Sequence, residues 1–208
     1  MVLDNASTDG TERFVADLPL TMRSRLPVSV RLQAANLGVA VGRQLLANNA
    51  DGEIFLFLDS DVVITEDRWL AQLLEPFTDE AVGVVGTAGS MVTFPEQGEA
   101  RPAPTQFLPS GAGKCDVVSG WCMAVRAGLF QHVAFDVERF SPRWEEDADL
   151  CLQVRACGYD VVQATVTGIE HQPGNDGAAD VDRQESLRKF REKWQGKGVI
   201  KMEGGYRA

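Results

Sequence analysis

The segment "EIFLFLDSDV", residues 53–62, decides the fold. Five consecutive apolar residues, Ile54 to Leu58, lead to two aspartates, Asp59 and Asp61, which are separated by one residue. A continuous apolar run of this length is typical of a strand buried on both faces of a sheet. Two carboxylates at the exit of such a strand are costly to bury without a cation. Because Mg²⁺ and Mn²⁺ accept carboxylates together with substrate phosphates, the pattern favours such a metal. The alternative is that Asp61 only caps a loop.

Strands and helices alternate through the first 90 residues. The predicted strands are residues 2–4, 28–33, 53–59 and 81–89, and the predicted helices lie near 7–17, 36–50 and 66–77, the first capped by Ser7 or Thr8. This alternation favours an α/β fold, Rossmann-like, with a mostly parallel sheet flanked by helices. Ligands of such sheets bind at the carboxyl ends of the strands, where we expect Asp4 and Asp59.

The second half has a different pattern. Residues 95–114 are rich in Pro, Gly and Ala and predict a long functional loop. Segments 115–126 and 160–171 are strand-like, and 145–159 and about 180–195 are helical. The tail helix carries Phe190 and Trp194 on one side, and we expect these aromatic side chains to dock on the domain rather than insert into lipid.

A second acidic cluster opens the helix at 145–159. Neighbouring residues on a helix point about 100° apart, so Glu146, Asp147 and Asp149 cannot all face one way. One of them is then free to face a cleft as a general base. The alternative is that these acids only complement the helix dipole. His171 ends a late strand and is a candidate third metal ligand, although a lone histidine is more often a surface residue.

Composition excludes several classes of protein. A net charge of −10 over 208 residues argues against a nucleic-acid partner. There is no apolar run of roughly 20 residues, and the first residues lack the pattern of a signal peptide, so none is expected. The four cysteines, which lack C-x-x-C spacing, predict reduced, mostly buried thiols in a cytoplasmic protein. From Asp180 onward eight basic residues face five acidic ones, giving the tail +3 and the rest −13. The tail is either a solvated helix or a peripheral contact with an anionic membrane surface.

Four motifs in order carry a family resemblance: "VLDNASTDGT", "NLGVAVGRQLLANNADGEIFLFLDSD", "VSGWCMAVRAGLF" and "EEDADLCLQVRACGY", with a late histidine after them. Over residues 2 to about 172 the chain resembles the family 2 glycosyltransferases of the GT-A fold, and rhamnosyltransferase-type members above all. The resemblance implies a cytoplasmic enzyme of cell-surface polysaccharide biosynthesis. It would transfer a sugar, with inversion, from a nucleotide-diphosphate sugar to a hydroxyl of a saccharide or lipid-linked acceptor, and it would use Mn²⁺ or Mg²⁺.

The resemblance also divides the chain, as one structural domain, into three parts. Residues 1–90 would bind the nucleotide-sugar, 91–175 would hold the acceptor and the catalytic residues, and 176–208 would form a basic amphipathic tail. On the nucleotide side it implies that Asp4 reads the base, that Asn36 and Arg43 line the nucleotide site, that Asp59 lies near the ribose, and that Trp121 contacts the donor sugar and acceptor.

For catalysis, the resemblance implies that Asp147 is the base, with Glu146 as its neighbour and fallback. It implies that Asp61, Asp59 and His171 bind the metal, Asp61 most firmly. Two other functions stay open: a non-catalytic nucleotide- or sugar-binding remnant, and a nucleotidyltransferase of similar fold. A Gly-rich basic loop near the first strand would favour the nucleotidyltransferase, and no such loop is visible in this sequence.

The sequence departs from the family pattern in two places. Gln44 stands where Asn is commoner after the arginine. The family's first strand–helix unit is missing, so the fold is predicted to be N-terminally truncated. Either a start codon lies about 30 to 40 residues late, or another segment or chain fills the gap. Unpaired sheet edges at such a gap predict association between copies as a homo-oligomer.

Overall fold

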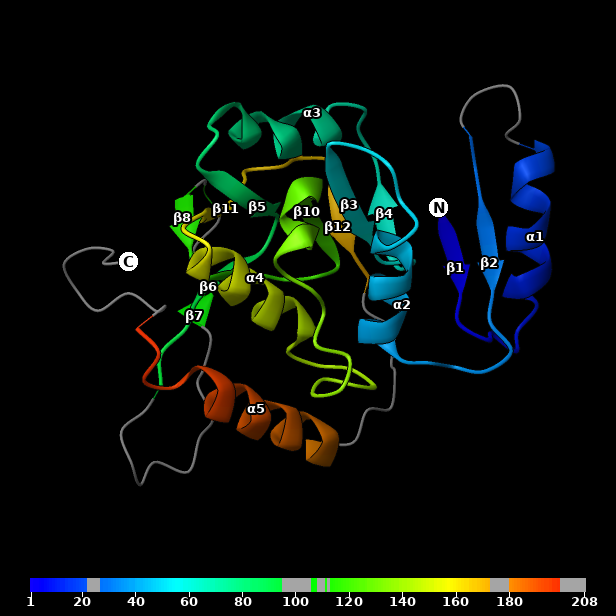
Figure 1. The fold of residues 1–208 in the computed structure, drawn as a ribbon. Coiled ribbons are helices and arrows are strands. Elements are labelled where there is room, and N and C mark those ends of the chain that lie inside the picture. Colours follow the sequence, from blue (N-terminus) through cyan, green and yellow to red (C-terminus); the bar gives the residue numbers. More distant parts are fainter. Residues whose placement is uncertain (22–26, 95–105, 108–110, 112, 173–179, 199–208) are drawn as a thin grey trace.

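The apolar run before Asp59 forms strand β3 (Ile54–Leu58) of a five-stranded sheet (Figure 1). The computed structural model describes residues 1–21, 27–94, 106–107, 111, 113–172 and 180–198. The strand order is β3-β10-β5-β11-β8. The other four strands are β10 (Cys122–Arg126), β5 (Val82–Gly86), β11 (Asp160–Gln163) and β8 (Gly113–Cys115).

The strand directions confirm the α/β class, but the sheet is mixed rather than mostly parallel as predicted, since only the β5–β11 pairing within it is parallel. Strand β11 runs parallel to β5, and β10 is antiparallel to both β5 and β3, so β3, β5 and β11 share one direction. Strand β8 is antiparallel to β11. An antiparallel strand needs no helical crossover, which explains how β10, which follows β5 without a helix in the described residues between them, can insert between β3 and β5.

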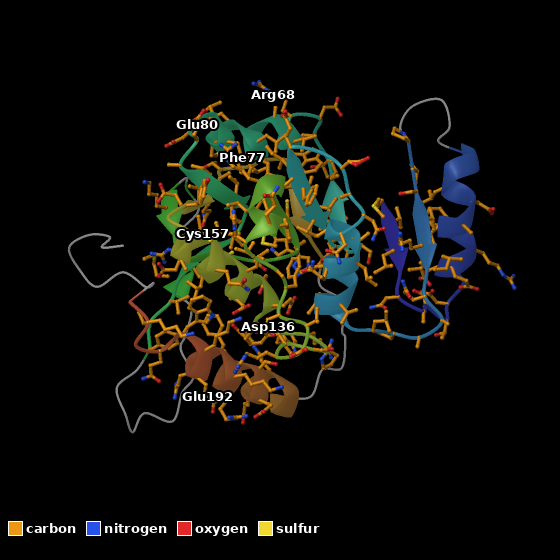
Figure 2. The ribbon with its side chains drawn as sticks, viewed as in Figure 1. Arg68, Phe77, Glu80, Asp136, Cys157 and Glu192 are labelled. Atoms are coloured by element: carbon orange, nitrogen blue, oxygen red, sulfur yellow. The ribbon has the colours of Figure 1, made fainter. Side chains whose placement is uncertain are left out.

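Two layers of side chains cover this sheet. Along β10, Cys122 and Ala124 join the apolar cluster under α3 (Trp69–Leu74), whereas Met123 and Val125 join the cluster under α4 (Glu146–Ala156). This is the alternation of a strand covered on both faces. Phe77, in the 3₁₀ turn Glu75–Thr78, packs into the α3 layer (Figure 2). A second 3₁₀ turn, Ala127–Gln131, follows β10.

The C-terminal helix α5 (Asp180–Trp194) packs on the α4 side of the molecule (Figure 1). Phe190 and Trp194 are 2% and 6% exposed and belong to the same apolar cluster as α4. The prediction that these aromatics dock on the domain is therefore confirmed, and they are not available to lipid. Among the described helices, none combines the length and the apolar character needed to cross a membrane.

Strand β1 (Val2–Asp4) pairs in parallel with β2 (Val30–Leu32) as a separate two-stranded sheet. Helix α1 (Thr11–Thr21) packs on this pair of strands, and α2 (Val39–Ala47) contacts β1, so that the strands lie between the two helices (Figure 1). The predicted cap of α1 was wrong: Asp9 accepts hydrogen bonds from Thr11 N (3.0 Å) and Thr11 Oγ1 (2.6 Å), so the helix begins later than expected.

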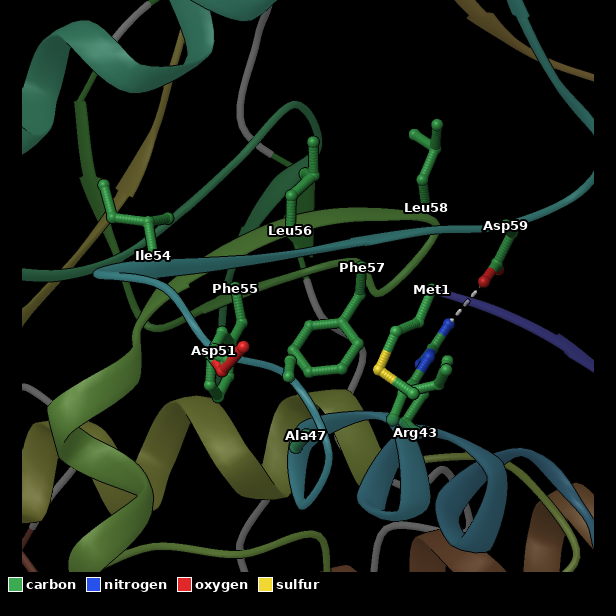
Figure 3. A pocket seen from close by; sticks show the side chains of 12 residues that line it. Met1, Arg43, Ala47, Asp51, Ile54, Phe55, Leu56, Phe57, Leu58 and Asp59 are labelled. Carbon is green, nitrogen blue, oxygen red and sulfur yellow. Dashed lines mark hydrogen bonds and ion pairs between the residues drawn. The ribbon is translucent and has the colours of Figure 1, made fainter. Parts of the chain in front are cut away.

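The prediction that β3 is buried on both faces was also wrong. Within β3 only Phe57 is buried, and Leu58 is 41% exposed. The reason is position, because β3 is the edge strand of the five-stranded sheet in the part of the chain that is described. A cavity of about 320 Å³ runs along it, lined also by α2 and by Met1 (Figure 3).

Two small sheets complete the described fold. Strands β4 (Val62–Ile64) and β12 (Ile169–His171) pair antiparallel, and β6 (Gly89–Met91) lies between β7 (Gln106–Phe107) and β9 (Val117–Val118). The predicted strands 81–89 and 160–171 each divide into two, and 115–126 contains the end of β8 together with β9 and β10. Most of the predicted loop 95–114 lies outside the described residues.

The cysteines follow the prediction. All four are free thiols, and three of them are buried, whereas Cys157 is exposed at the end of α4 (Figure 2). Burial raises the pKa of both Cys115 and Cys122 to about 12, so these thiols stay protonated.

Candidate functional site

Three predicted metal ligands come together at the end of β3. One ligand atom from each of Asp59, Asp61 and His171 lies within 4.8 Å of the others. The pairing of β12 with β4 sets His171 opposite Val62, and Gln172 N donates to Asp61 O at 2.9 Å. Strand pairing therefore brings His171 next to two aspartates that lie more than a hundred positions earlier in the chain.

The donor set fits a divalent cation. Asp61 Oδ1 is buried and accepts no hydrogen bond from the described residues, although His171 Nε2 lies 3.2 Å away. Two carboxylates and an imidazole suit Mn²⁺ well and Mg²⁺ to a lesser degree, because imidazole is a softer ligand than oxygen. The Trp121 ring stacks on His171 with centroids 5.0 Å apart and planes 3° apart, which fixes the imidazole plane.

A tight turn before β10 places Trp121 beside Asp59. Trp121 O accepts a hydrogen bond from Asp59 N at 3.0 Å, and the next residue, Cys122, pairs with Leu58. Gly120 N donates to Asp147 Oδ2 at 2.6 Å. The same short turn therefore touches both the D-x-D segment and the acidic start of α4.

Arg43 of α2 bridges the two acidic clusters. It is only 7% exposed, and its guanidinium donates to Asp59 Oδ1 and to Glu146 Oε1, both at 2.8 Å. Figure 3 shows the pair with Asp59. Burial lowers the pKa of Arg43, but the Glu146 and Asp59 carboxylates outweigh it and the net pKa is raised. A Cβ on Gly120 would lie 2.2 Å from Arg43 Nη1, so the bridge needs glycine there.

The two candidate bases at the start of α4 have different surroundings. Glu146 is 5% exposed, binds Arg43 through Oε1, and has Oε2 buried without a hydrogen-bond partner among the described residues. Burial and the Asp147 carboxylate raise the pKa of Glu146 against the opposing effect of Arg43. Asp147 is half-buried, and its oxygens accept from Gly120 N and, at 2.7 Å, from Ala148 N.

The predicted nucleotide-side residues of the N-terminal part lie in a separate hydrogen-bonded group. Asn36 Oδ1 accepts from Asn5 Nδ2 at 3.1 Å and from Gly38 N at 2.9 Å, which joins β1 to the start of α2. Asp4 is 4% exposed; Oδ2 accepts from Ser7 N at 3.2 Å, while Oδ1 is buried without a hydrogen-bond partner in the described segments. An unsatisfied buried acceptor of this kind is expected where a ligand donates a hydrogen bond.

Comparison with known proteins decides the family. The sequence pattern described as "Glycosyl transferase family 2" matches residues 1–133, more than half of the chain. The chain belongs to glycosyl transferase family 2. A relative in Bacillus subtilis (strain 168), the uncharacterized glycosyltransferase YfnE, is 39% identical over 71 residues, which cover 32% of this chain and 16% of YfnE. The match thus spans a small part of YfnE.

Solved structures confirm the GT-A fold. GalNAc-T7 with UDP, GalNAc and Mn²⁺ superposes with a TM-score of 0.69 at 14% identity, covering 94% of this chain and 42% of the other. The mannosyltransferase PcManGT from Pyrobaculum calidifontis, with GDP-Man and Mn²⁺, gives 0.62 at 18% identity, covering 84% and 48%. S. aureus TarS 1-349 gives 0.54 at 16% identity, covering 95% and 64%. The family 2 chain spans less than two thirds of each.

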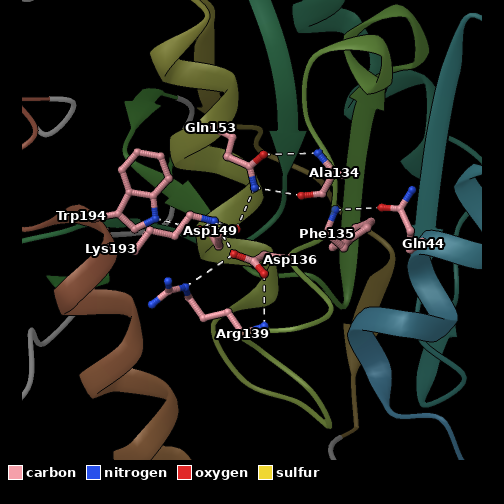
Figure 4. Close-up of polar contacts among 9 residues, drawn as sticks. All are labelled: Gln44, Ala134, Phe135, Asp136, Arg139, Asp149, Gln153, Lys193 and Trp194. Atoms are coloured by element: carbon pink, nitrogen blue, oxygen red, sulfur yellow. Dashed lines mark hydrogen bonds and ion pairs between the residues drawn. The ribbon is translucent and has the colours of Figure 1, made fainter.

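The structure of this family 2 member brings most of the predicted site together. Asp59, Asp61, His171 and Trp121 form one cluster, and Arg43 joins it to the Glu146–Asp147 pair; Asp4 and Asn36 lie apart, in and beside the β1–β2 unit. Sequence reasoning missed the role of Gly120, which holds Asp147 and packs on Arg43. The "SGW" triplet before β10 was the available signal. Gln44, the departure from the family pattern, accepts from Phe135 N at 2.8 Å (Figure 4).

Proposed function

We propose that this chain transfers a sugar from a nucleotide-diphosphate sugar to an acceptor hydroxyl. One observation carries the proposal: Arg43 ties the Asp59–Asp61–His171 cluster to the helix start that bears Asp147. A cation-binding cluster and a carboxylate base held in one bonded unit suit displacement of a diphosphate leaving group. The relatives whose structures contain UDP or GDP-Man with Mn²⁺ support a nucleotide-sugar as donor.

Asp61 and His171, with Asp59, would hold Mn²⁺ or Mg²⁺. When bound, the ion would act as a Lewis acid that neutralises the diphosphate. One carboxylate oxygen of Asp59 would accept a hydrogen bond from Arg43, and the other would contact the ion or the ribose. The stacked Trp121 ring would keep His171 in the ligating orientation and present its edge to the donor sugar.

Asp147 would take the proton of the attacking hydroxyl. Its two backbone hydrogen bonds fix the carboxylate, whereas Glu146 is engaged with Arg43 and buried. Glu146 is therefore the weaker candidate. A single displacement by a hydroxyl on the face opposite the diphosphate predicts inversion at the anomeric carbon, which NMR of the product would test. Asp4 would accept a hydrogen bond from the base through its unsatisfied Oδ1, with Asn36 holding the adjoining turn.

Calorimetric titration with UDP, GDP and dTDP, with and without Mn²⁺, tests the donor site. We expect Mn²⁺-dependent binding of one nucleotide, and we expect Asp61→Asn to abolish the metal dependence. Glu80→Gln is the matched control, because it also removes one negative charge. Glu80 is exposed and follows the 3₁₀ turn after α3 (Figure 2). Absence of metal-dependent binding to all three nucleotides would refute the proposed function.

The product released separates the three functions. A glycosyltransferase releases the nucleoside diphosphate, a nucleotidyltransferase releases pyrophosphate, and a binding remnant releases neither. We expect Asp147→Asn to lower nucleoside-diphosphate release by about 10² to 10⁴ with donor affinity kept, the usual contribution of general base catalysis. Normal turnover by this variant would refute the assignment of Asp147.

The remaining expectations concern partners and location. The acceptor would be a saccharide or lipid-linked saccharide, and the enzyme would act in the cytoplasm in making cell-surface polysaccharide. Membrane contact through the tail would have to use exposed basic residues, because Phe190 and Trp194 are buried and Lys193 is paired internally. Association between copies through β3 is testable by light scattering as a function of concentration.

A further inference from the structure

The residues before α4 have an unusual backbone. Trp144 and Glu145 have φ of 79° and 68°, a left-handed conformation that side chains with a Cβ rarely adopt. These two residues lead directly into Glu146 and Asp147, so their conformation determines how the first turn of α4 leaves the preceding loop. Such strain persists only where the surroundings hold it.

Helix α5 holds this turn from one side. Ser186 Oγ, on a 6% exposed residue, donates to Arg143 O at 3.2 Å. The Arg183 guanidinium lies over the Trp144 ring, 5.1 Å from its centroid. Its positive charge also lowers the pKa of Glu145, against the burial that raises it. The start of α2 holds the same loop through Val39 N, which donates to Pro142 O at 2.6 Å.

The other end of α5 is fixed to α4 itself. Trp194 Nε1 donates to Asp149 Oδ1 at 2.8 Å, and Lys193 Nζ binds Asp149 at 2.8 Å and Asp136 at 2.8 Å (Figure 4). Asp149 is fully buried in α4, two residues after Asp147. The C-terminal end of α5 therefore binds the first turns of α4, and its N-terminal half contacts the strained residues that precede α4.

We propose that α5 is a positioning element of the active site, in which Arg183 and Ser186 hold the Trp144–Glu145 turn so that Asp147 faces the acceptor. The catalytic half of this inference rests on the proposed function, whereas the mechanical half does not. The tail thus has a role inside the site rather than at a membrane. Arg183 touches no reacting atom in this scheme and acts through Trp144 and Glu145.

Three variants of the full chain test the inference. Arg183→Ala removes the contact with Trp144; Arg183→Lys keeps the charge and can lie over the ring; and Arg188→Ala is the matched control, because Arg188 is 55% exposed and pairs with Glu185 and Glu192 of α5. Hydrogen exchange of the 143–150 backbone is measured first. Among these three arginine variants, we expect faster exchange only in Arg183→Ala, with thermal stability equal to that of the control. Ser186→Ala should have the same effect as Arg183→Ala.

Turnover is measured next, as nucleoside-diphosphate release from UDP-, GDP- and dTDP-sugars with Mn²⁺. We expect Arg183→Ala to lower kcat by about 10- to 100-fold, the cost of a misplaced catalytic group, with the donor KM unchanged and with rescue by lysine. Exchange equal to that of Arg188→Ala, or faster exchange with normal kcat, would overturn the inference. A wild-type chain that binds no nucleotide would refute the proposed function alone, since the exchange comparison still decides whether α5 holds the turn.

Discussion

Replacing Arg43 with methionine should destabilise the fold strongly. Arg43 makes two 2.8 Å ion pairs while 7% exposed, and one of them is to Glu146, which is 5% exposed and has a second oxygen without a hydrogen-bond partner among the described residues. Methionine fills similar volume but leaves the Glu146 carboxylate buried and unpaired. Removing one partner of a buried pair costs about 3–5 kcal/mol. For a chain of this length each kcal/mol lowers Tm by roughly 2–4 °C, so a fall of roughly 6–20 °C is expected.

Circular dichroism during heating measures the effect, and a double-mutant cycle identifies its cause. Because glutamine carries no charge, the Arg43→Met/Glu146→Gln variant should unfold at a higher temperature than Arg43→Met alone. Arg68→Met is the control, since Arg68 is exposed and a surface change typically stays within about 0.5 kcal/mol. If Arg43→Met unfolds with the control, or if Glu146→Gln gives it no recovery, the bridge is not what holds these elements together.

Three more changes follow from the same geometry. Gly120→Ala should push the Arg43 guanidinium off its partners, since the new Cβ lies 2.2 Å from Nη1, and loss of donor turnover together with a lower Tm would show it. Burial and then Asp147 raise the pKa of Glu145 from 4.5 to about 7, so the free energy of unfolding falls progressively as pH rises from about 4.5 to about 7. Glu145→Gln should therefore raise Tm relative to wild type at pH 8 but not at pH 5; an equal effect at both would contradict this. His171→Ala should weaken Mn²⁺ binding, read by calorimetry, while nucleotide binding without metal stays unchanged.

Local pattern was sufficient for the strand that leads to the two aspartates and for the helix that carries the second acidic cluster. The apolar run into Asp59 predicted β3 and its exit, and the alternation of strand and helix predicted that β3 and β5 run the same way. The acids and the terminal Gly158 of the 145–159 segment predicted α4, and Gly158 does adopt a positive φ of 88° after the helix. These features depend on side-chain periodicity and on the conformational limits of single residues, which a sequence displays directly.

The contacts that make the site one unit could not be predicted in this way. Arg43 and Glu146 are 103 positions apart, and their pairing depends on how α2 and α4 lie relative to one another in the folded chain. The left-handed Trp144 and Glu145 have no glycine to mark them, because the conformation comes from α5 and α2 holding the loop rather than from local preference. The exposure of β3 was missed for the same reason, since an edge position depends on which strands are its neighbours.

Arg43 also explains how so many carboxylates can share this site. The carboxylates of Asp59, Glu146 and Asp147 all act to raise the pKa of Arg43, and its guanidinium donates hydrogen bonds to the first two. Because Oδ1 of Asp59 accepts a hydrogen bond from the guanidinium, Asp61 and His171 are the candidate metal ligands that do not pair with Arg43. A divalent ion placed there would repel the Arg43 guanidinium and would compete with it for the Asp59 carboxylate. Binding of the metal and donor near β3 would then change the ion pair between Arg43 and Glu146, which precedes Asp147 at the start of α4. In this way Arg43 would couple the donor half of the site to its base.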